Sequence, residues 1–225
     1  MSSPISQSII NSAVNYKAKP RDAFLCAYPK CGITWLQNIV WLIVDNGESF
    51  KGAMRSSIPI LDVYGGEALE AFDDSVNPLI VKTHFPYSAI PLNPESKYIY
   101  ITRNPKDCLA SYYFHVKGFV DDYQCPDVTL NDVFRLFVSG EVDYNSYFDH
   151  VVQWYSKREE PNVLFLLYED LKRDLRSNVL KIARFLGSDY EEKMLENNEE
   201  VLEKVLDQSS FKFMHKQPTN IWVIN

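Results

Sequence analysis

The chain has 225 residues, a length that suits one α/β domain with a substantial core or at most two small domains. Its net charge of −7 at pH 7 provides no broad basic field, so we expect positive potential only within a cleft and no nucleic-acid partner. A hydrophobic fraction of 46%, with 14% aromatic residues, is typical of a packed globule.

The distribution of apolar residues and cysteines excludes further classes. The N-terminus has no basic start followed by an apolar core, and the most apolar run, 35–44, is interrupted by Gln37 and Asn38. We therefore expect neither a signal peptide nor a membrane span. The four cysteines lack metal-type spacing, and no Asn-X-Ser/Thr sequon occurs. A reduced, cytoplasmic setting without a bound metal is the simplest interpretation.

Apolar periodicity and turn residues predict the first elements in chain order. They are a strand over 24–28, a helix over 34–45 ended by Gly47, loops and short helices over 47–77, a strand over 79–81, a second strand within KYIYITRNP, and a helix over 106–116 that follows Pro105.

The second half continues the alternation of strands and helices. Its predicted elements are a helix from the N-cap Thr129 through Phe137 with Gly140 at its end, helices over 144–157, 175–186 and 190–206, and a buried strand over 163–167. Alternating strands and helices favour an α/β fold with a mostly parallel central sheet and helices on both faces. We see no repeat or linker, so we expect residues 1–225 to form a single domain.

The turn in "YPKCGITW" joins the first strand to the first helix. Backbone N–H groups at a helix N-terminus favour an anion, and Gly32 lets a phosphate approach the backbone closely. Lys30 adds a positive charge and Thr34 a hydroxyl. The pattern is not a Walker A motif, so nucleotide triphosphatase or small-molecule kinase chemistry is disfavoured. The alternative is an ordinary helix start with a solvated lysine.

Polar residues also follow the next two strands. In "VKTHFP", Lys82 and His84 are two apart and point to one side of the strand, while Thr83 points away. His84 is a candidate base, because an imidazole can accept a proton from a hydroxyl at neutral pH. A structural hydrogen-bonding histidine is the alternative, and we interpret His115, His150 and His215 in that way.

Arg103 and Ser111 could grip a second anion across a strand-to-helix turn; the alternative is a surface ion pair and a helix hydroxyl. Phe85, Tyr87, Tyr113 and Phe114 lie in the same segments and are candidates for the core or for the wall of an apolar pocket. Together these sites indicate a ligand with two separated anionic groups and a base nearby.

Five motifs, in order, carry a family resemblance: "YPKCGITW", "KTHFP", "RNPKDCLASYY", "LLYEDLKRD" and "SSFKFM". The sequence resembles the cytosolic sulfotransferases, whose donor is 3′-phosphoadenosine 5′-phosphosulfate. The resemblance extends over 19–218. It implies a P-loop-like turn that binds the phosphosulfate, and in-line sulfuryl transfer without a metal.

The resemblance also implies roles for individual residues. Lys30 and the amides of Cys31, Gly32, Ile33, Thr34 and Trp35 hold the 5′-phosphosulfate, and Lys30 neutralises the leaving oxygen. Arg103 and Ser111 bind the 3′-phosphate. The adenine site is formed by Trp35, Tyr168, Ser209 and Phe211. His84 is the general base, assisted by Lys82, and the acceptor site includes Lys82, Thr83, His84, Phe85, Tyr87 and Phe114.

Two departures from the family pattern accompany the resemblance. Cys31 and Ile33 stand where the family usually has serine and threonine, which removes two hydroxyls but keeps the backbone amides. The family's basic C-terminal segment, which completes the 3′-phosphate site, and its dimerisation motif are not in this sequence, so we expect a monomer.

These observations lead to a functional hypothesis. We expect sulfuryl transfer to a hydroxyl or amine of a small acceptor: a phenol, a catechol-type amine or a steroid-like alcohol. The alternative is a truncated, weakly active or inactive homologue that binds the donor, adenosine bisphosphate or a small apolar ligand.

Overall fold

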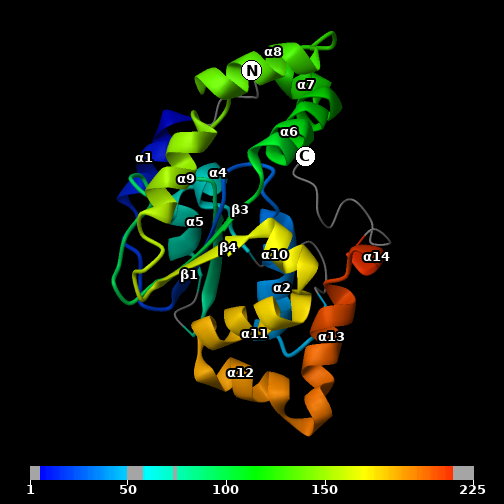
Figure 1. The fold of residues 1–225 in the computed structure, drawn as a ribbon. Helices are drawn as coiled ribbons and strands as arrows, with labels where there is room; N and C mark the ends of the chain where they lie inside the picture. The colour runs from blue at the N-terminus through cyan, green and yellow to red at the C-terminus, as the bar shows by residue number, and fades with distance from the viewer. Residues whose placement is uncertain (1–5, 50–57, 73–74, 215–225) are drawn as a thin grey trace.

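The computed structural model describes residues 6–49, 58–72 and 75–214, and its centre is a parallel sheet (Figure 1). Within these residues the sheet has four strands in the order β2-β1-β3-β4, and every neighbouring pair is parallel. The strands are β1 (Asp22–Cys26), β2 (Leu79–Thr83), β3 (Lys97–Thr102) and β4 (Val163–Leu167). Parallel strands of this kind are buried on both faces, which agrees with their nearly continuous apolar sequence.

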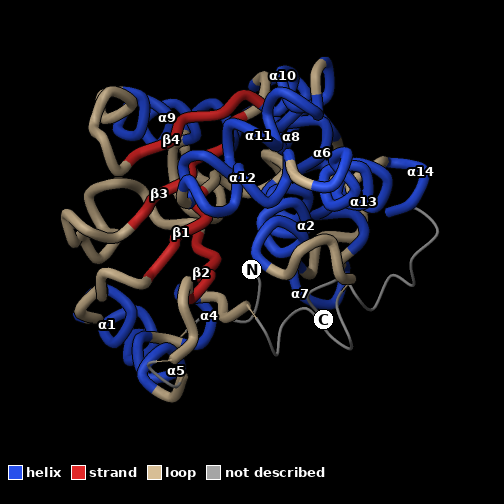
Figure 2. The backbone as a smooth tube through the Cα atoms, turned by 90° about the horizontal axis from the view of Figure 1, so that it is seen from below, coloured by secondary structure: helices blue, strands red, loops and turns tan. Residues whose placement is uncertain are grey.

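Helices cover both faces of the sheet, as Figure 2 shows from below. Ala23 and Leu25 of β1 belong to one core cluster, and the alternate residues Phe24 and Cys26 belong to the other. The first cluster includes residues of α2 (Ile33–Val44), α11 (Leu175–Leu186), α12 (Ser188–Leu195) and α13 (Glu200–Gln208). The second includes residues of α1 (Gln7–Asn15), α4 (Leu61–Tyr64), α5 (Gly66–Glu70) and α9 (Tyr147–Tyr155). The predicted fold class is confirmed.

A smaller helical group extends beyond the sheet. It consists of α6 (Pro105–Gly118), α7 (Val120–Tyr123) and α8 (Leu130–Ser139). Tyr112, Val116 and Val133 form a third buried cluster between α6 and α8. The remaining elements are α10 (Tyr168–Arg173), the short 3₁₀ helix η1 (Asn197–Glu199) and α14 (Phe211–Met214).

Helix ends follow the predicted capping residues. Thr129 accepts a hydrogen bond from the backbone N–H of Asp132, whose side chain accepts in return from the N–H of Thr129. Gly140, at φ 77°, ends α8 as predicted.

No helix in the described ranges has the length and apolar character that crossing a bilayer requires.

Backbone geometry corrects several predicted boundaries. The first strand ends at Cys26, two residues before the predicted end. The helix predicted over 144–157 begins only at Tyr147, because Tyr144 and Asn145 are left-handed and Ser146 provides the cap. The helix predicted over 190–206 is two helices, because left-handed residues at 197–199 interrupt it. α1 and α10 were not predicted.

Candidate active site

The polar residues that follow the four strands lie at one edge of the sheet, because the carboxyl ends of parallel strands point the same way. The residues are Lys30 after β1, His84 after β2, Arg103 after β3 and Tyr168 after β4. This edge is where the predicted site residues fall.

The turn between β1 and α2 has a backbone that suits an anion. Lys30 and Gly32 are both left-handed, at φ 68° and 96°. Gly32 is the N-cap of the twelve-residue α2, and no side chain caps the first amides of that helix. A side chain at Gly32 would be strained and would lie 2.5 Å from Cδ2 of Tyr168, so both conformation and space require glycine here.

Successive residues of this turn alternate between partly exposed and buried positions. Lys30, Gly32 and Thr34 are partly exposed, whereas Cys31 and Ile33 are 0% and 5% exposed and belong to the core cluster under the sheet. The two positions that depart from the family pattern therefore direct their side chains into the core. Only their backbone amides remain candidates for holding a ligand.

Lys30 is a half-buried cation beside other charged groups. Burial lowers the pKa of its ammonium, the neighbouring Cys108 raises it, and the guanidinium of Arg103 lowers it further. A bound anion between these two cations would stabilise the charged lysine. Ser111 of α6 is half-buried, and no hydrogen bond joins its side chain to another residue in the described part of the chain.

The ring of His84 is held in one tautomer. Its Nδ1 lies 2.9 Å from the carbonyl oxygen of Ala27, and since a carbonyl can only accept, Nδ1 carries the proton. Nε2 is then the unprotonated nitrogen, able to accept a proton. Burial lowers the pKa of His84 to about 4, against the opposing effect of Asp62, and Lys82 lowers it further. The imidazole is consequently neutral at pH 7.

The backbone of His84 is also held from two sides. Its N–H donates to Oδ1 of Asp62 at 3.0 Å, and its carbonyl accepts from Nε2 of His150 at 3.0 Å. The hydroxyl of Tyr144 donates to Oδ2 of Asp62 at 2.5 Å. Sequence reasoning missed all three supports. The sequence feature that could have indicated these contacts is Asp62, an isolated acidic residue within the apolar segment "IPILDVY".

An aromatic group lies beside the turn. The ring centroids of Trp35, Tyr168 and Phe211 are between 4.7 and 6.5 Å apart. The guanidinium of Arg103 lies over the Tyr168 ring at 4.6 Å, and indole Nε1 of Trp35 donates to the carbonyl of Ser209 at 2.8 Å. The structure thus brings the five predicted residues together.

Two buried polar atoms in this group have no hydrogen-bond partner among the described residues: Nε of Arg103 and Oγ of Ser209. Buried polar atoms are nearly always satisfied, so this pair is available to hydrogen-bond a ligand, although Arg21 and Asp22 at the other end of the sheet also carry one such atom each. A guanidinium, a hydroxyl and three rings are suited to a nucleotide with an additional phosphate, and the residues present therefore fit the donor.

The predicted acceptor residues are not brought together. Thr83 is fully buried and accepts from the N–H of Phe85 at 3.1 Å, and Phe85 belongs to the opposite core cluster. Tyr87 packs edge-on against Trp154. Phe114 is 70% exposed on α6 and contacts Tyr113. Of the residues predicted for the acceptor, Lys82 and His84 lie beside the turn that carries Lys30.

In the described ranges, no group of His, Cys, Asp or Glu side chains is arranged to hold a metal ion.

Comparison with known proteins identifies the family of the chain. A family model described as "Sulfotransferase domain" matches residues 20–223. The chain belongs to the sulfotransferase family. Rat (Rattus norvegicus) sulfotransferase 1C2 is 35% identical over 215 residues, which cover 90% of this chain and 69% of that protein.

Solved structures of sulfotransferase relatives share the fold. Mouse SULT7A1 complexed with PAP has a TM-score of 0.76 at 28% identity, covering 95% of this chain and 73% of that chain. Retinol dehydratase in a complex with retinol and PAP has a TM-score of 0.81 at 25% identity, covering 94% and 72%. The family predicted from the five motifs, and the parallel sheet with its P-loop-like turn, are confirmed.

Proposed function

We propose that this sulfotransferase moves the sulfuryl group of 3′-phosphoadenosine 5′-phosphosulfate to a hydroxyl or amine of a small acceptor. The observation that carries the proposal is the tautomer of His84. Its Nδ1 donates to the carbonyl of Ala27, which leaves Nε2 unprotonated at the edge of the sheet near Lys30 and Lys82. Family membership and the PAP complexes of SULT7A1 and retinol dehydratase support the choice of donor.

The proposed reaction needs no group beyond donor and acceptor. The acceptor oxygen or nitrogen attacks sulfur, a new bond to sulfur forms, and the bond between sulfur and the bridging phosphate oxygen breaks. The proton of the acceptor passes to Nε2 of His84. Lys30 stabilises the negative charge that develops on the departing phosphate oxygen, and Lys82 stabilises the transferring group.

The rest of the donor has proposed contacts along the sheet edge. The amides of 31–35 receive the 5′-phosphosulfate, and Arg103 and Ser111 receive the 3′-phosphate. Trp35, Tyr168 and Phe211 contact the adenine, with Ser209 beside them. The orphaned Nε of Arg103 and Oγ of Ser209 support this placement, because both are buried polar atoms without a partner in the described residues.

For the acceptor we propose a phenol, a catechol-type amine or a steroid-like alcohol. The complex of retinol dehydratase with retinol, a small apolar alcohol, supports an apolar acceptor bearing a hydroxyl. A phenol is the most acidic hydroxyl among these acceptors, so it loses its proton to the neutral His84 most readily. The cytoplasmic location and the monomeric state remain predictions.

The test is transfer from sulfur-labelled donor to a panel of phenols, amines and sterols. Binding of adenosine bisphosphate is measured in parallel by calorimetry. Wild type and the control His115→Ala, a histidine on α6 outside the site, are expected to transfer label, and His84→Ala to lose transfer while keeping binding. Transfer that survives in His84→Ala would contradict the proposed base. Binding without transfer by wild type would support a binding protein instead.

A further inference from the structure

Asp62 is a buried carboxylate whose two oxygens are both used beside the candidate base. It is 1% exposed; Oδ1 accepts from the backbone N–H of His84, and Oδ2 accepts from the hydroxyl of Tyr144. Burying a carboxylate is unfavourable unless hydrogen bonds or charges compensate for the lost water. The burial of a carboxylate at this position therefore indicates a role beyond packing.

The element that carries Asp62 is fixed on two sides. Ile60, just before α4, forms a parallel bridge with Lys82 of β2. Just after α4, the N–H of Gly66 donates to the hydroxyl of Ser12 on α1, and a side chain at Gly66 would lie 2.6 Å from the Ser12 carbonyl oxygen. α4 is therefore held between β2 and α1, which keeps the carboxylate in one place.

Tyr144 reaches Asp62 from a strained loop. Its φ of 67° and that of Asn145, 60°, are uncommon for residues with side chains, and such strain is frequent at functional sites. The conformation brings the Tyr144 hydroxyl to Asp62 and its ring to 5.2 Å from the His84 ring, at 62°. One residue thus contacts both the carboxylate and the imidazole.

We propose that Asp62, with Tyr144, is a positioning residue for His84: it fixes the backbone of the base and compensates the charge that the imidazole gains with the acceptor's proton. This inference rests on the proposed function, in which Nε2 of His84 receives that proton. The hydrogen bonds of Asp62 go to the backbone N–H of His84 and to the Tyr144 hydroxyl, so Asp62 acts through His84 and not on the substrate.

The charges around His84 show why a carboxylate is needed. The titratable groups that face it are Asp62 from α4, Tyr144 from the loop before α9, His150 from α9, Lys82 from β2, and Lys30 from the turn after β1. Lys82 and Lys30 both disfavour a protonated His84, whereas Asp62 favours it. Without Asp62, the imidazolium would face two cations while buried.

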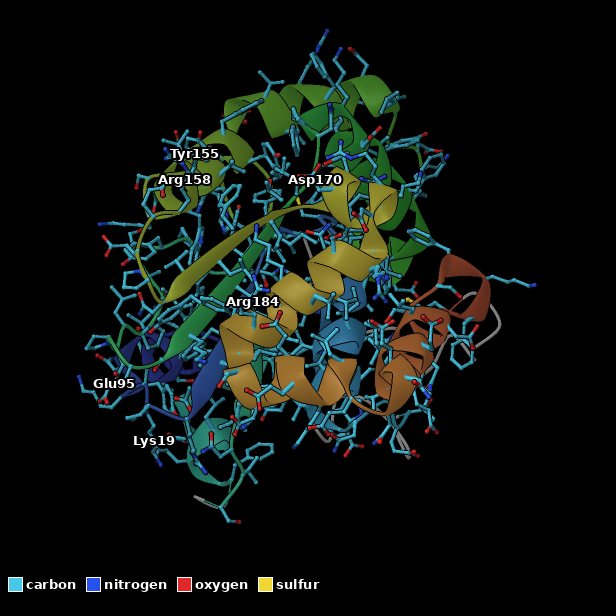
Figure 3. All side chains as sticks on the ribbon, turned by 60° about the horizontal axis from the view of Figure 1, so that its bottom comes forward. Lys19, Glu95, Tyr155, Arg158, Asp170 and Arg184 are labelled. Atoms are coloured by element: carbon cyan, nitrogen blue, oxygen red, sulfur yellow. The ribbon has the colours of Figure 1, made fainter. Side chains whose placement is uncertain are left out.

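The decisive variant is Asp62→Asn, which keeps the shape and removes the charge. Tyr144→Phe keeps the ring and removes the hydrogen bond to Asp62. The matched control is Asp22→Asn: Asp22 is also 1% exposed and also accepts from a tyrosine, Tyr16, at 2.9 Å. Asp22 lies at the amino end of β1, where it accepts from the backbone N–H of Lys19. Asp170 follows β4 and marks the carboxyl edge of the sheet. Figure 3 labels Lys19 and Asp170 and shows them far apart.

Two measurements test the proposal on the full chain. In the first, the His84 ring is titrated by NMR with adenosine bisphosphate bound, which requires no turnover. We expect Asp62→Asn to lower the midpoint by about one pH unit or more or, where the chain unfolds before the midpoint is reached, to keep the ring neutral down to the unfolding pH while the ring of wild type begins to protonate. In the second, the pH profile of kcat/KM is recorded. We expect its acid limb to move to lower pH in Asp62→Asn, with kcat at pH 7 reduced about tenfold to hundredfold. Binding of adenosine bisphosphate should change less than about threefold.

Tyr144→Phe should show smaller changes in the same direction, and Asp22→Asn none. An unchanged His84 titration in Asp62→Asn, with kcat within about twofold of wild type, would overturn the proposal. If Asp62→Asn fails to fold, Tyr144→Phe provides the titration. Absence of transfer by wild type overturns the proposed function instead, and the titration then still decides whether Asp62 controls the charge of His84.

Discussion

The Sγ atoms of Cys31 and Cys108 lie 3.7 Å apart, and both side chains are fully buried beneath the turn between β1 and α2. The Cys108 thiol also donates to the carbonyl of Pro29 at 3.3 Å, so the thiols tie the turn to α6. The Cys31 side chain therefore packs in the core against α6. Only the backbone of residue 31 is left for contact with the proposed donor.

The first prediction concerns Cys31→Ser, which restores the residue usual in the family. Because the side chain at 31 faces the core, we expect affinity for adenosine bisphosphate to stay within about threefold of wild type. The free energy of unfolding should fall by roughly 1 kcal/mol, since a hydroxyl replaces a thiol in an apolar site. Calorimetry and urea unfolding measure the two effects. A gain in affinity of about tenfold would mean that the side chain contacts the donor.

The second prediction concerns Gly32→Ala. The left-handed φ of 96° and the Tyr168 ring at 2.5 Å from the new Cβ predict a loss of roughly 1–3 kcal/mol in stability, and displacement of the turn. Affinity for adenosine bisphosphate should fall about tenfold or more. Gly118→Ala is the matched control: nothing lies within 4 Å of its new Cβ and Gly118 ends α6, so binding should be unchanged and stability should be unchanged or raised by up to about 1 kcal/mol. Equal behaviour of both variants would contradict the assignment of the turn.

The third prediction concerns thiol reactivity. Burial raises the pKa of Cys26 and Cys31, and Cys108 is fully buried, whereas Cys125 is exposed. Because the thiolate is the reactive form, a colorimetric disulfide reagent should modify one thiol per folded chain quickly and four in denaturant. Cys125→Ser should abolish the fast phase. A fast phase that persists in this variant would show that the core opens readily.

Sequence reasoning found the strands and the residues at their carboxyl ends because both signals are local. An apolar run followed by Lys30, His84 or Arg103 is visible along the chain, and parallel topology brings those ends together. The supports of His84 could not be found in this way. Asp62 and Tyr144 are 82 positions apart and meet only in the folded chain, where both contact His84, so no local pattern joins them.

The same distinction explains why the structure groups the side chains predicted for the adenine and does not group those predicted for the acceptor. Tyr168 directly follows β4, and Trp35 lies in the first turn of α2, after the turn that follows β1; the family resemblance implied that the two rings meet. Phe85, Tyr87 and Phe114 are also near the motifs in sequence. Their directions depend on strand pleat and helix rotation, however, which place Phe85 in the opposite core and Phe114 in solvent.

The fourth prediction concerns the pairing of Arg103 with Tyr168. The guanidinium lies over the ring at 4.6 Å and its Nε has no partner among the described residues. Arg103→Lys keeps the charge but loses the planar fork, so affinity for adenosine bisphosphate should fall about tenfold. Tyr168→Phe keeps the ring and should change affinity less than about twofold. If adenosine 5′-monophosphate loses as much affinity as the bisphosphate in Arg103→Lys, Arg103 does not bind the 3′-phosphate.

The fifth prediction concerns acid stability. Burial lowers the pKa values of His84 and His150 from 6.5 to about 4, so the unfolded chain binds protons there before the folded chain does. Stability from each histidine is fully present above pH 6.5 and is lost as the pH falls toward 4, by roughly 3 kcal/mol per group. Urea unfolding between pH 7 and 4 measures this decline. His150→Gln keeps a donor for the His84 carbonyl but cannot titrate, so its stability should decline less steeply than that of wild type. Parallel declines for the two proteins would show that His150 is not neutral and buried in the folded state.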